Sequence, residues 1–310
     1  MSVSQKAATG PTSIEAALAD DPGGRGLCGD PRLRAALRGA IRRAASGLAR
    51  ADRVLIVTGF LIERAGVGES DGPPGAAVLA RALARLGKDV RIVTDGYSAA
   101  LVEAAAAALG ERPRVQALSP ADGEAACVSI LADFRPDVVV SVERPGKAAD
   151  GGFYSMRGSD MRALVPDADA LVARAADHGA VSVAVGDGGN ELGMGSIGAI
   201  IDERVPLGPT IKAVTSADEL IVAGVSNWGA YALVRAIELL LRDQGRTVRL
   251  LHGPGDETAM LEAVAAAGGV DGCSGRREPT VDGVSPEADL AALEAIRAAT
   301  SIEGEGNPDD

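Results

Sequence analysis

The chain has 310 residues and a formal net charge of −12, so it is long enough to bury a large core but lacks the basic surface usual in nucleic-acid-binding proteins. Hydrophobic residues make up 46% of the sequence and aromatic residues only 2%, which predicts an aliphatic core with few rings for stacking on bases. No apolar run reaches the roughly 18 residues of a membrane span, and the three cysteines form no CxxC pair, so we expect no nucleic-acid partner, no membrane partner and no disulfide framework.

Two kinds of segment alternate along the chain. Short runs rich in valine, isoleucine and leucine are typical of strands buried on both faces, and the segments between them have helical periodicity. The predicted strands cover residues 54–58, 90–94, 115–118, 138–142, 181–185 and 248–251. The predicted helices cover residues 31–49, 76–86, 99–109, 123–134, 167–178, 228–242, 258–267 and 286–299. This alternation predicts a three-layer α/β fold, with a mainly parallel sheet and helices on both faces.

The same pattern sets the expected domain organisation. We expect a single domain over residues 12–302, with a division into two lobes left open, and flexible tails at residues 1–11 and 303–310. The N-terminal segment has no signal-peptide core, and its acidic residues are unlike those of a transit peptide, so we expect a cytoplasmic location. A homo-oligomer also stays open.

The glycine-rich segment at residues 186–195 follows a predicted strand. It reads Gly186-Asp187-Gly188-Gly189-Asn190-Glu191-Leu192-Gly193-Met194-Gly195. Glycine allows backbone to approach a ligand closely or to take positive φ, and carboxylate and amide oxygens bind hard metal ions or ammonium groups. The segment therefore predicts a site. A tight turn with a solvated acid is the alternative, although such a turn needs only one or two glycines.

Acidic residues follow four of the predicted strands. Glu69 and Asp71 lie in the loop after the first strand, while Asp95, Glu143 and Asp187 each come at or just after the end of a later one. Because parallel strands share one carboxyl edge, where open α/β folds bind ligands, we expect these acids to converge there. Oxygen ligands without histidine suit Mn²⁺ or Mg²⁺, with Ca²⁺ as a further option. For Glu69 and Asp71 a capped helix entry is the alternative.

Two arginines near these acids are candidates for binding a carboxylate in a bidentate manner. They are Arg144, beside Glu143, and Arg157, in a segment of small residues. A surface ion pair is the alternative for each. Further acids, Asp271 and Asp282, lie in turn-like Asp-Gly pairs near the C-terminus. We expect Asn227 to cap the helix that follows it.

Several cofactor classes have no support in the sequence. No GxGxxG opens a helix after the first strand and no Walker A segment occurs, so we expect no nucleotide. Lys147 lies in a glycine-rich loop but has no identifiable partner for a pyridine nitrogen, so we expect no pyridoxal phosphate. No HExxH or CxxC ligand set for zinc is present.

The order of the glycine-rich motifs resembles that of the D-glutamate cyclase family over residues 14–296. The motifs are Thr58-Gly59-Phe60, Glu69-Ser70-Asp71-Gly72-Pro73-Pro74-Gly75-Ala76, Glu143-Arg144-Pro145-Gly146, Asp150-Gly151, Met156-Arg157-Gly158, the segment 186–195 and Ser226-Asn227-Trp228-Gly229-Ala230-Tyr231. Ser70 and Lys147 depart from the threonine and arginine more usual there. The resemblance implies a lyase that converts D-glutamate to 5-oxo-D-proline and water.

Roles for individual residues follow from what ring closure requires, namely an activated carboxylate, a base and a bound substrate. The expected metal ligands are Glu69, Asp71, Glu143 and Asp187, and the expected catalytic residues are Glu143, Asp187 and Glu191. The expected substrate-binding residues are Thr58, Arg144, Arg157, Gly188, Gly189 and Asn190. Ligand and base are not separated. A metal-dependent phosphoester hydrolase and a non-catalytic protein that binds an amino acid or a metal are the alternatives.

Overall fold

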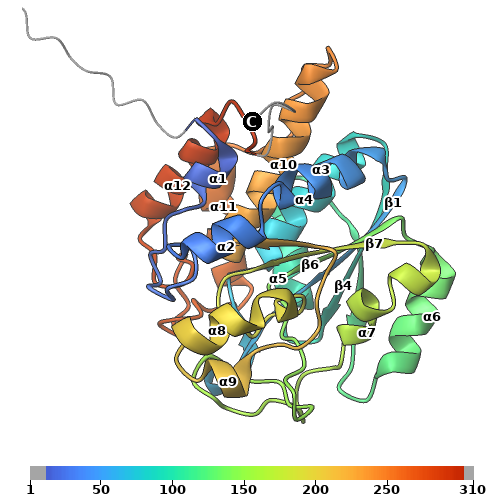
Figure 1. Cartoon of the computed structure of the whole chain (residues 1–310), viewed down its shortest axis with the longest axis vertical. Helices are drawn as coiled ribbons and strands as arrows, with labels where there is room; N and C mark the ends of the chain where they lie inside the picture. Colours follow the sequence, from blue (N-terminus) through green and yellow to red (C-terminus); the bar gives the residue numbers. More distant parts are fainter. Residues whose placement is uncertain (1–11, 304–310) are drawn as a thin grey trace, which may run out of the picture.

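The computed structural model describes residues 12–303 and has three layers, with a central sheet between two sets of helices (Figure 1). The strands are β1 (Arg53–Thr58), β2 (Leu61–Ile62), β3 (Val67–Gly68), β4 (Asp89–Asp95), β5 (Arg114–Leu118), β6 (Val138–Val142), β7 (Val181–Gly186) and β8 (Glu219–Val222). The six-stranded sheet has the order β5-β4-β1-β6-β7-β8 with every pair parallel, and β2 and β3 form a separate antiparallel pair. The predicted three-layer α/β fold is confirmed.

Helices surround this sheet over the described part of the chain. They are α1 (Ile14–Ala17), α2 (Pro31–Ala36), α3 (Ala40–Arg50), α4 (Pro73–Arg85), α5 (Ala99–Ala108), α6 (Glu124–Phe134), α7 (Asp169–Ala173), α8 (Gly198–Arg204), α9 (Gly208–Ile211), α10 (Ser226–Asp243), α11 (Pro254–Ala266) and α12 (Pro286–Ala298). Three short 3₁₀ helices are η1 (Glu63–Ala65), η2 (Ala176–His178) and η3 (Gly195–Ile197). No helix among residues 12–303 is long and apolar enough to cross a membrane.

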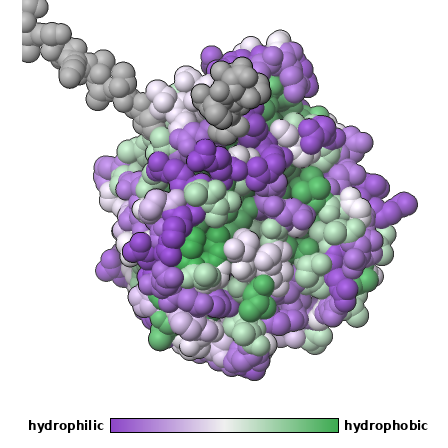
Figure 2. Space-filling model, viewed as in Figure 1, coloured by the Kyte–Doolittle hydropathy of each residue, from purple (hydrophilic) through white to green (hydrophobic). Residues whose placement is uncertain are grey.

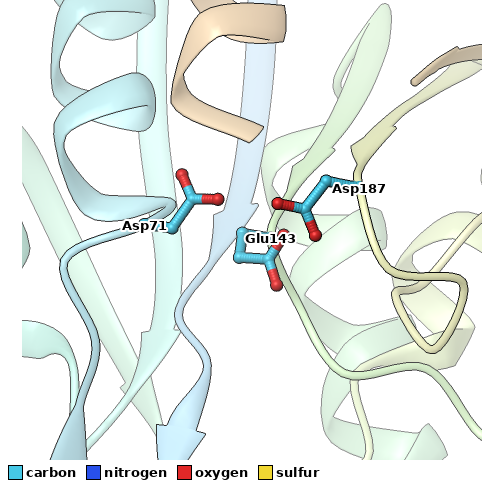
Figure 3. Close-up of side chains that lie close together, drawn as sticks. All are labelled: Asp71, Glu143 and Asp187. Carbon is cyan, nitrogen blue, oxygen red and sulfur yellow. The ribbon is translucent and has the colours of Figure 1, made fainter. Parts of the chain in front are cut away.

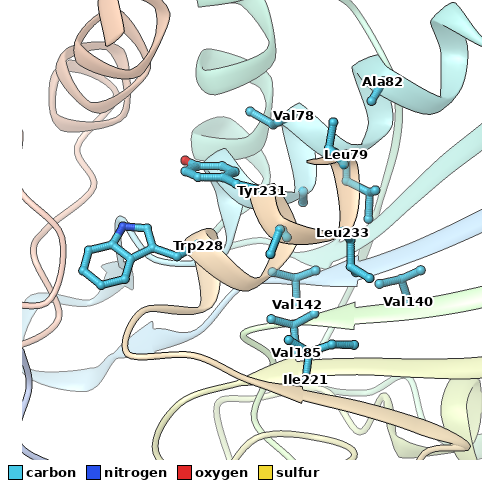
Figure 4. Packing of buried hydrophobic residues seen from close by; sticks show 14 of the residues in the cluster. Val78, Leu79, Ala82, Val140, Val142, Val185, Ile221, Trp228, Tyr231 and Leu233 are labelled. Atoms are coloured by element: carbon cyan, nitrogen blue, oxygen red, sulfur yellow. The ribbon is translucent and has the colours of Figure 1, made fainter. Parts of the chain in front are cut away.

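Alternate residues of each strand pack against opposite helical layers, as expected for parallel strands buried on both faces. On one face, Val140 and Val142 lie in the same cluster as side chains of α3, α4, α5 and α10. Figure 4 shows this packing around Tyr231 and Leu233 of α10. On the other face, Leu55 of β1 and Val139 of β6 lie in one cluster with side chains of α6 and α7. The aliphatic core predicted from composition therefore holds the sheet rigidly in place.

The strand order places a crevice at one end of the sheet. From β1 the chain moves to β4 on one side, whereas from β6 it moves to β7 on the other side. The loops that leave β1 and β6 therefore diverge at the carboxyl edge, which is where doubly wound sheets bind ligands. Asp71 and Glu143 lie in these two loops.

Three predicted elements differ from the structure. The single helix predicted over residues 31–49 is divided into α2 and α3 by a turn in which Gly39 has a φ of 74°. The strand predicted over residues 248–251 is absent, because the backbone N–H groups of Leu250 and Leu251 donate instead to the carboxylate of Glu238 at 2.5 and 2.8 Å. The helix predicted over residues 167–178 is shortened to α7 and η2, and β8 was not predicted.

The single-domain organisation over residues 12–302 stays a prediction. Tails were predicted at residues 1–11 and 303–310, and of these, residues 1–11 and 304–310 lie outside the described residues. Glu303 lies just inside that limit, and its carboxylate accepts a hydrogen bond of 2.8 Å from the Ser13 hydroxyl.

Candidate active site

Three carboxylates meet at the carboxyl edge of the sheet. Asp71, Glu143 and Asp187 come from the loops after β1, β6 and β7, and each offers an oxygen atom within 4.8 Å of an oxygen from both others. Figure 3 shows the three side chains pointing toward one another. Their residues are only 1%, 5% and 3% exposed. The expected convergence of these acids is therefore a feature of the structure.

Two helix N-termini hold this group through reciprocal contacts. The carboxylate of Asp71, just before α4, accepts from the backbone N–H groups of Ser226 and Asn227 at the start of α10, both at 2.8 Å. The Asn227 side-chain oxygen in turn accepts from Gly72 and Gly75 at the start of α4, at 2.9 and 2.8 Å. Asn227 therefore caps α4 across the structure and not its own helix, contrary to the prediction. Both helix N-termini face the acids, which favours negative charge there.

Glu143 has a backbone conformation that its surroundings impose. Its φ is 44°, in the left-handed region that residues with a side chain rarely adopt. Its N–H donates to Val185 at 3.2 Å, and its carbonyl accepts from Gly59 at 3.1 Å. The Ser226 hydroxyl fixes the side chain by donating to Oε2 at 2.6 Å. A side chain at Gly72 would lie 2.9 Å from the Glu143 Cβ, so glycine is needed there. Strain of this kind clusters at functional sites.

Burial and mutual repulsion act on the protonation of these acids. Burial first, and then Asp282, raises the pKa of Asp71 to about 8. Burial, followed by the neighbouring Glu191, raises the pKa of Glu143 well above its usual value. The pKa of Asp187 is also raised by burial, which the charge of Arg25 offsets only in part. Such a cluster needs a proton or a cation to become neutral.

The donor set fits a divalent cation of the hard class. All three side chains offer oxygen atoms, which Mg²⁺, Mn²⁺ and Ca²⁺ prefer. Oδ2 of Asp187 is buried and accepts no hydrogen bond within residues 12–303, where its one close positive charge is the Arg25 guanidinium at 3.1 Å. Glu69, the fourth expected ligand, is 6% exposed and lies beside the group, but it does not share the close geometry of the other three. Burial raises the pKa of Glu69 well above its usual value.

Arg25 is a site residue that the sequence analysis missed. It comes from the segment between α1 and α2, and its guanidinium lies 3.1 Å from Asp187 and 3.0 Å from Asp282. Its side chain is only 13% exposed. One guanidinium cannot neutralise the whole acidic group, so capacity for a further cation remains.

Glu191 and the glycines beside it contact one another. The Glu191 carboxylate accepts from the backbone N–H groups of Gly188 and Gly189, both at 2.6 Å, and from that of Asp187 at 3.3 Å. These amides therefore point at Glu191. A side chain at Gly188 would lie 2.8 Å from the sulfur of Met156 and 2.9 Å from Glu191, which explains the need for glycine. Glu191 thus shapes the loop that carries Asp187.

A cavity of about 320 Å³ opens beside the acids. Its lining includes Arg25, Arg64, Glu69, Glu143, Arg157, Asp187, Asn190, Glu191 and Asp282. The side-chain nitrogen of Asn190 donates to the Tyr154 carbonyl at 2.7 Å, while its Oδ1 is buried without a hydrogen-bond partner in the described chain. Asn190 therefore brings a free acceptor to the cavity.

Four of the six expected substrate-binding residues are not among the lining residues, namely Thr58, Arg144, Gly188 and Gly189. The Arg144 side chain is 1% exposed and pairs with Asp95, and it also donates to the carbonyls of Gly59 at 3.1 Å and Pro166 at 2.8 Å. Thr58 is fully buried at the end of β1 and is not among the lining residues. Arg157, in contrast, is exposed and lines the cavity.

A second cavity, of about 190 Å³, lies near α2 and β8. Its apolar lining includes Leu33, Leu37, Ile41 and Val222, and it holds no group of three metal-ligating side chains among residues 12–303. Figure 2 shows hydrophobic side chains gathered near the middle of one face, with hydrophilic side chains around them. The acid-lined cavity is therefore the candidate site.

Comparison with known proteins now decides the family. The family described as "D-glutamate cyclase-like, C-terminal" matches residues 14–297, nearly the whole chain. The chain belongs to the D-glutamate cyclase-like family. Its sequence is 36% identical to human "D-glutamate cyclase, mitochondrial" over 245 residues, which is 73% of this chain but only 38% of the human protein. The family resemblance predicted from the motifs is confirmed.

A second relative has a different name. "Tetraacyldisaccharide 4'-kinase" of Anaeromyxobacter dehalogenans (strain 2CP-C) is 31% identical over 279 residues, covering 87% of this chain and 68% of that protein. The present sequence has no GxxxxGK[ST] phosphate-binding loop. The acidic site described above therefore rests on the cyclase-like motifs and not on this second similarity.

Proposed function

We propose that the chain is a D-glutamate cyclase, a lyase that converts D-glutamate to 5-oxo-D-proline and water with the help of a divalent cation. One observation carries the proposal. Asp71, Glu143 and Asp187 bring three oxygen atoms within 4.8 Å at an acid-lined cavity, in a chain of the D-glutamate cyclase-like family. Mn²⁺ and Mg²⁺ are the expected cations.

The fit of a cation follows from residues already described. Asp71, Glu143 and Asp187 would hold it, with Glu69 as a further acid nearby. When bound, it would supply Lewis acidity that makes the γ-carboxylate of the substrate a better electrophile. Ser226 and the α10 N-terminus would keep two of the ligands in place.

Ring closure requires the movement of protons that this site can accept and return. The bond that forms joins the α-nitrogen to the γ-carboxyl carbon, and the bond that breaks is one carbon–oxygen bond of that carboxylate. The ammonium group gives up two protons, and both leave with the departing oxygen as water. A carboxylate of the site that is not engaged by the cation would carry a proton between the two atoms, and Glu143, Asp187 and Glu191 are the candidates.

Other residues would position the substrate. Asn190 Oδ1 is a free acceptor for the ammonium group, and Arg157 can bind the α-carboxylate. Arg144 would act indirectly, because its contacts go to Asp95 and to backbone carbonyls, and Glu191 also holds the loop backbone. Holding nitrogen and carboxyl carbon in contact supplies much of the effect expected of such a site.

The test is incubation of the protein with D- and L-glutamate, with and without Mn²⁺ or Mg²⁺, followed by mass spectrometry. We expect a product lighter by one water from the D-enantiomer. Release of phosphate from simple esters, with no ring closure, would favour the phosphoester hydrolase. If glutamate stabilises the protein against unfolding but neither glutamate nor the esters are converted, a binding protein is favoured. The cytoplasmic location stays a prediction, because the human relative is described as mitochondrial.

A further inference from the structure

Two arginines on the exposed side of the cavity donate to the same backbone oxygen. Arg64, in η1, and Arg157, in the loop after β6, donate to the Cys273 carbonyl at 2.9 and 3.2 Å. Since both nitrogens lie within 3.2 Å of one oxygen, they are no more than about 6 Å apart. Three segments distant in sequence therefore bring two positive charges together at the cavity.

These charges have no carboxylate partner of their own in the described part of the chain. The hydrogen bonds of Arg64 and Arg157 go to the Cys273 carbonyl, and neither side chain forms an ion pair among residues 12–303. Each guanidinium has five N–H donors, so most of them remain for a ligand. Two like charges held this close favour an anion that contacts both.

The backbone of the neighbouring loop is shaped around one of these arginines. Gly275 has a φ of 70°, and a side chain there would lie 2.6 Å from Nε and from a terminal nitrogen of Arg64. The glycine lets the guanidinium of Arg64 lie directly against the loop. Arg64 therefore lies against this loop while its side chain stays exposed.

The lining of the cavity carries charges of both signs. Among the lining residues Glu143 and Asp187 are buried, while Arg64 and Arg157, like Glu63, are exposed. Arg25 is the third lining arginine, but it is already paired with Asp187 and Asp282. A ligand that fits this arrangement has its reacting groups toward the acids and a separate carboxylate toward the two arginines.

We propose that Arg64 and Arg157 form a clamp for the α-carboxylate of an acidic amino acid, and that Arg64 is a specificity-determining residue. The choice of ligand rests on the proposed function. In ring closure the γ-carboxylate is consumed, whereas the α-carboxylate is retained in both substrate and product. The clamp would thus select compounds that carry this second carboxylate.

The test uses two lactams that do not turn over in the forward direction. The first, 5-oxo-D-proline, keeps the carboxylate, and the second, 2-pyrrolidinone, is the same ring without it. Calorimetry with the full chain should show tighter binding of 5-oxo-D-proline. We expect Arg64→Ala and Arg157→Ala each to weaken that binding by at least about tenfold, the scale of a lost hydrogen bond between charged groups. Binding of 2-pyrrolidinone should not change.

The matched control is Arg276→Ala, which removes an arginine from the same loop as Gly275. Arg276 pairs with Glu278 at 3.1 Å and does not line the cavity. It should bind 5-oxo-D-proline like the unaltered protein, and melting curves should show that all three variants are folded. Unchanged binding by Arg64→Ala, or no preference for the carboxylate in the unaltered protein, overturns the clamp. If the protein binds 5-oxo-D-proline more tightly than 2-pyrrolidinone but does not close the ring of D-glutamate, the proposed function is overturned and the clamp stays in place.

Discussion

Two groups of buried carboxyl side chains differ in their access to a cavity and in their partners. At the carboxyl edge, Asp71, Glu143 and Asp187 face one another beside a cavity. Between α10, α11 and α12, Glu257 and Asp289 are also nearly inaccessible, at 1% and 2% exposed. Neither of this second pair lines the acid-lined cavity.

The second group is enclosed by side chains that contact it, although Oδ2 of Asp289 is buried without a hydrogen-bond partner among the described residues. Glu257 accepts from Tyr231 at 3.1 Å and lies 2.5 Å from His252, and Asp289 accepts from Trp228 at 2.7 Å. Burial raises the pKa of both carboxyls to about 7 and lowers the pKa of His252 to about 3. Shifted pKa values therefore occur in both groups, and what distinguishes the candidate site is the geometry of its oxygens and its contact with a cavity.

The two groups should differ most in how the loss of one charge affects ring-closing turnover. Asp187→Asn should lower ring-closing turnover by at least about a hundredfold, the usual scale for loss of a general acid or base. Folding should be spared, because the lost charge lies among like charges. Asp289→Asn is the matched change in the other group and should keep turnover. Turnover and melting temperature should be measured together. Near-normal turnover in Asp187→Asn would remove the 186–195 loop from the mechanism.

Metal binding should separate the two groups in a second way. Adding Mn²⁺ at a hundred times its dissociation constant should stabilise the chelator-treated protein by about 2.7 kcal/mol, since the ion binds the folded state. Glu143→Gln should remove most of this effect, and Glu257→Gln should retain it. Melting curves over a series of Mn²⁺ concentrations provide the measurement. Equal stabilisation of both variants would place the ion elsewhere.

The variant Glu191→Gln tests whether Glu191 serves to hold the glycine-rich loop in place. Both of its oxygens accept from backbone N–H groups, and the amide of Glu191→Gln can accept at only one. We expect a loss of about 1–3 kcal/mol in the free energy of unfolding, the scale for an unsatisfied buried group. Urea unfolding would measure it. A variant as stable as the original would instead favour Glu191 as the base.

The smallest expected effect concerns pH and the enclosed group. The pKa of Glu257 is raised from 4.5 to about 7, so its stabilising contribution is present at low pH and is lost as the pH rises through 7. Glu257→Gln cannot ionise and should lose less stability between pH 5.5 and 7.5, a difference of about 2 °C or more in melting temperature. The acids of the candidate site contribute equally to the pH dependence of stability in the unaltered protein and in Glu257→Gln. Parallel pH curves for the two proteins would contradict this assignment.

Much of the sheet could be predicted because its strands are distinct in sequence. The valine-rich runs of β6 and β7 and the acids that follow them fix both the parallel edge and the convergence of Glu143 with Asp187. The short β8 was missed because its run of strand-forming residues, Leu220-Ile221-Val222, is short, and its four residues make it the shortest strand of the sheet.

Partners brought together by the fold could not be predicted. Arg25 reaches Asp187 from a loop that precedes the whole sheet, and no spacing in the sequence indicates that contact. Arg144 has the sequence context of a ligand-binding arginine, yet it pairs with Asp95 from another strand and is buried. Pairings between distant charges depend on tertiary structure, and for these residues the sequence left alternatives that only the structure could separate.

The reciprocal caps between α4 and α10 have a consequence for local motion. Opening the first turn of α10 would release Asp71, Glu143 and the start of α4 at once, since Asn227 and Ser226 contact all three regions. The amide hydrogens of Gly72, Gly75, Ser226 and Asn227 should therefore exchange with solvent as one unit, with a common free energy of opening. Two helices that are far apart in sequence would in this way open and close together around the acids.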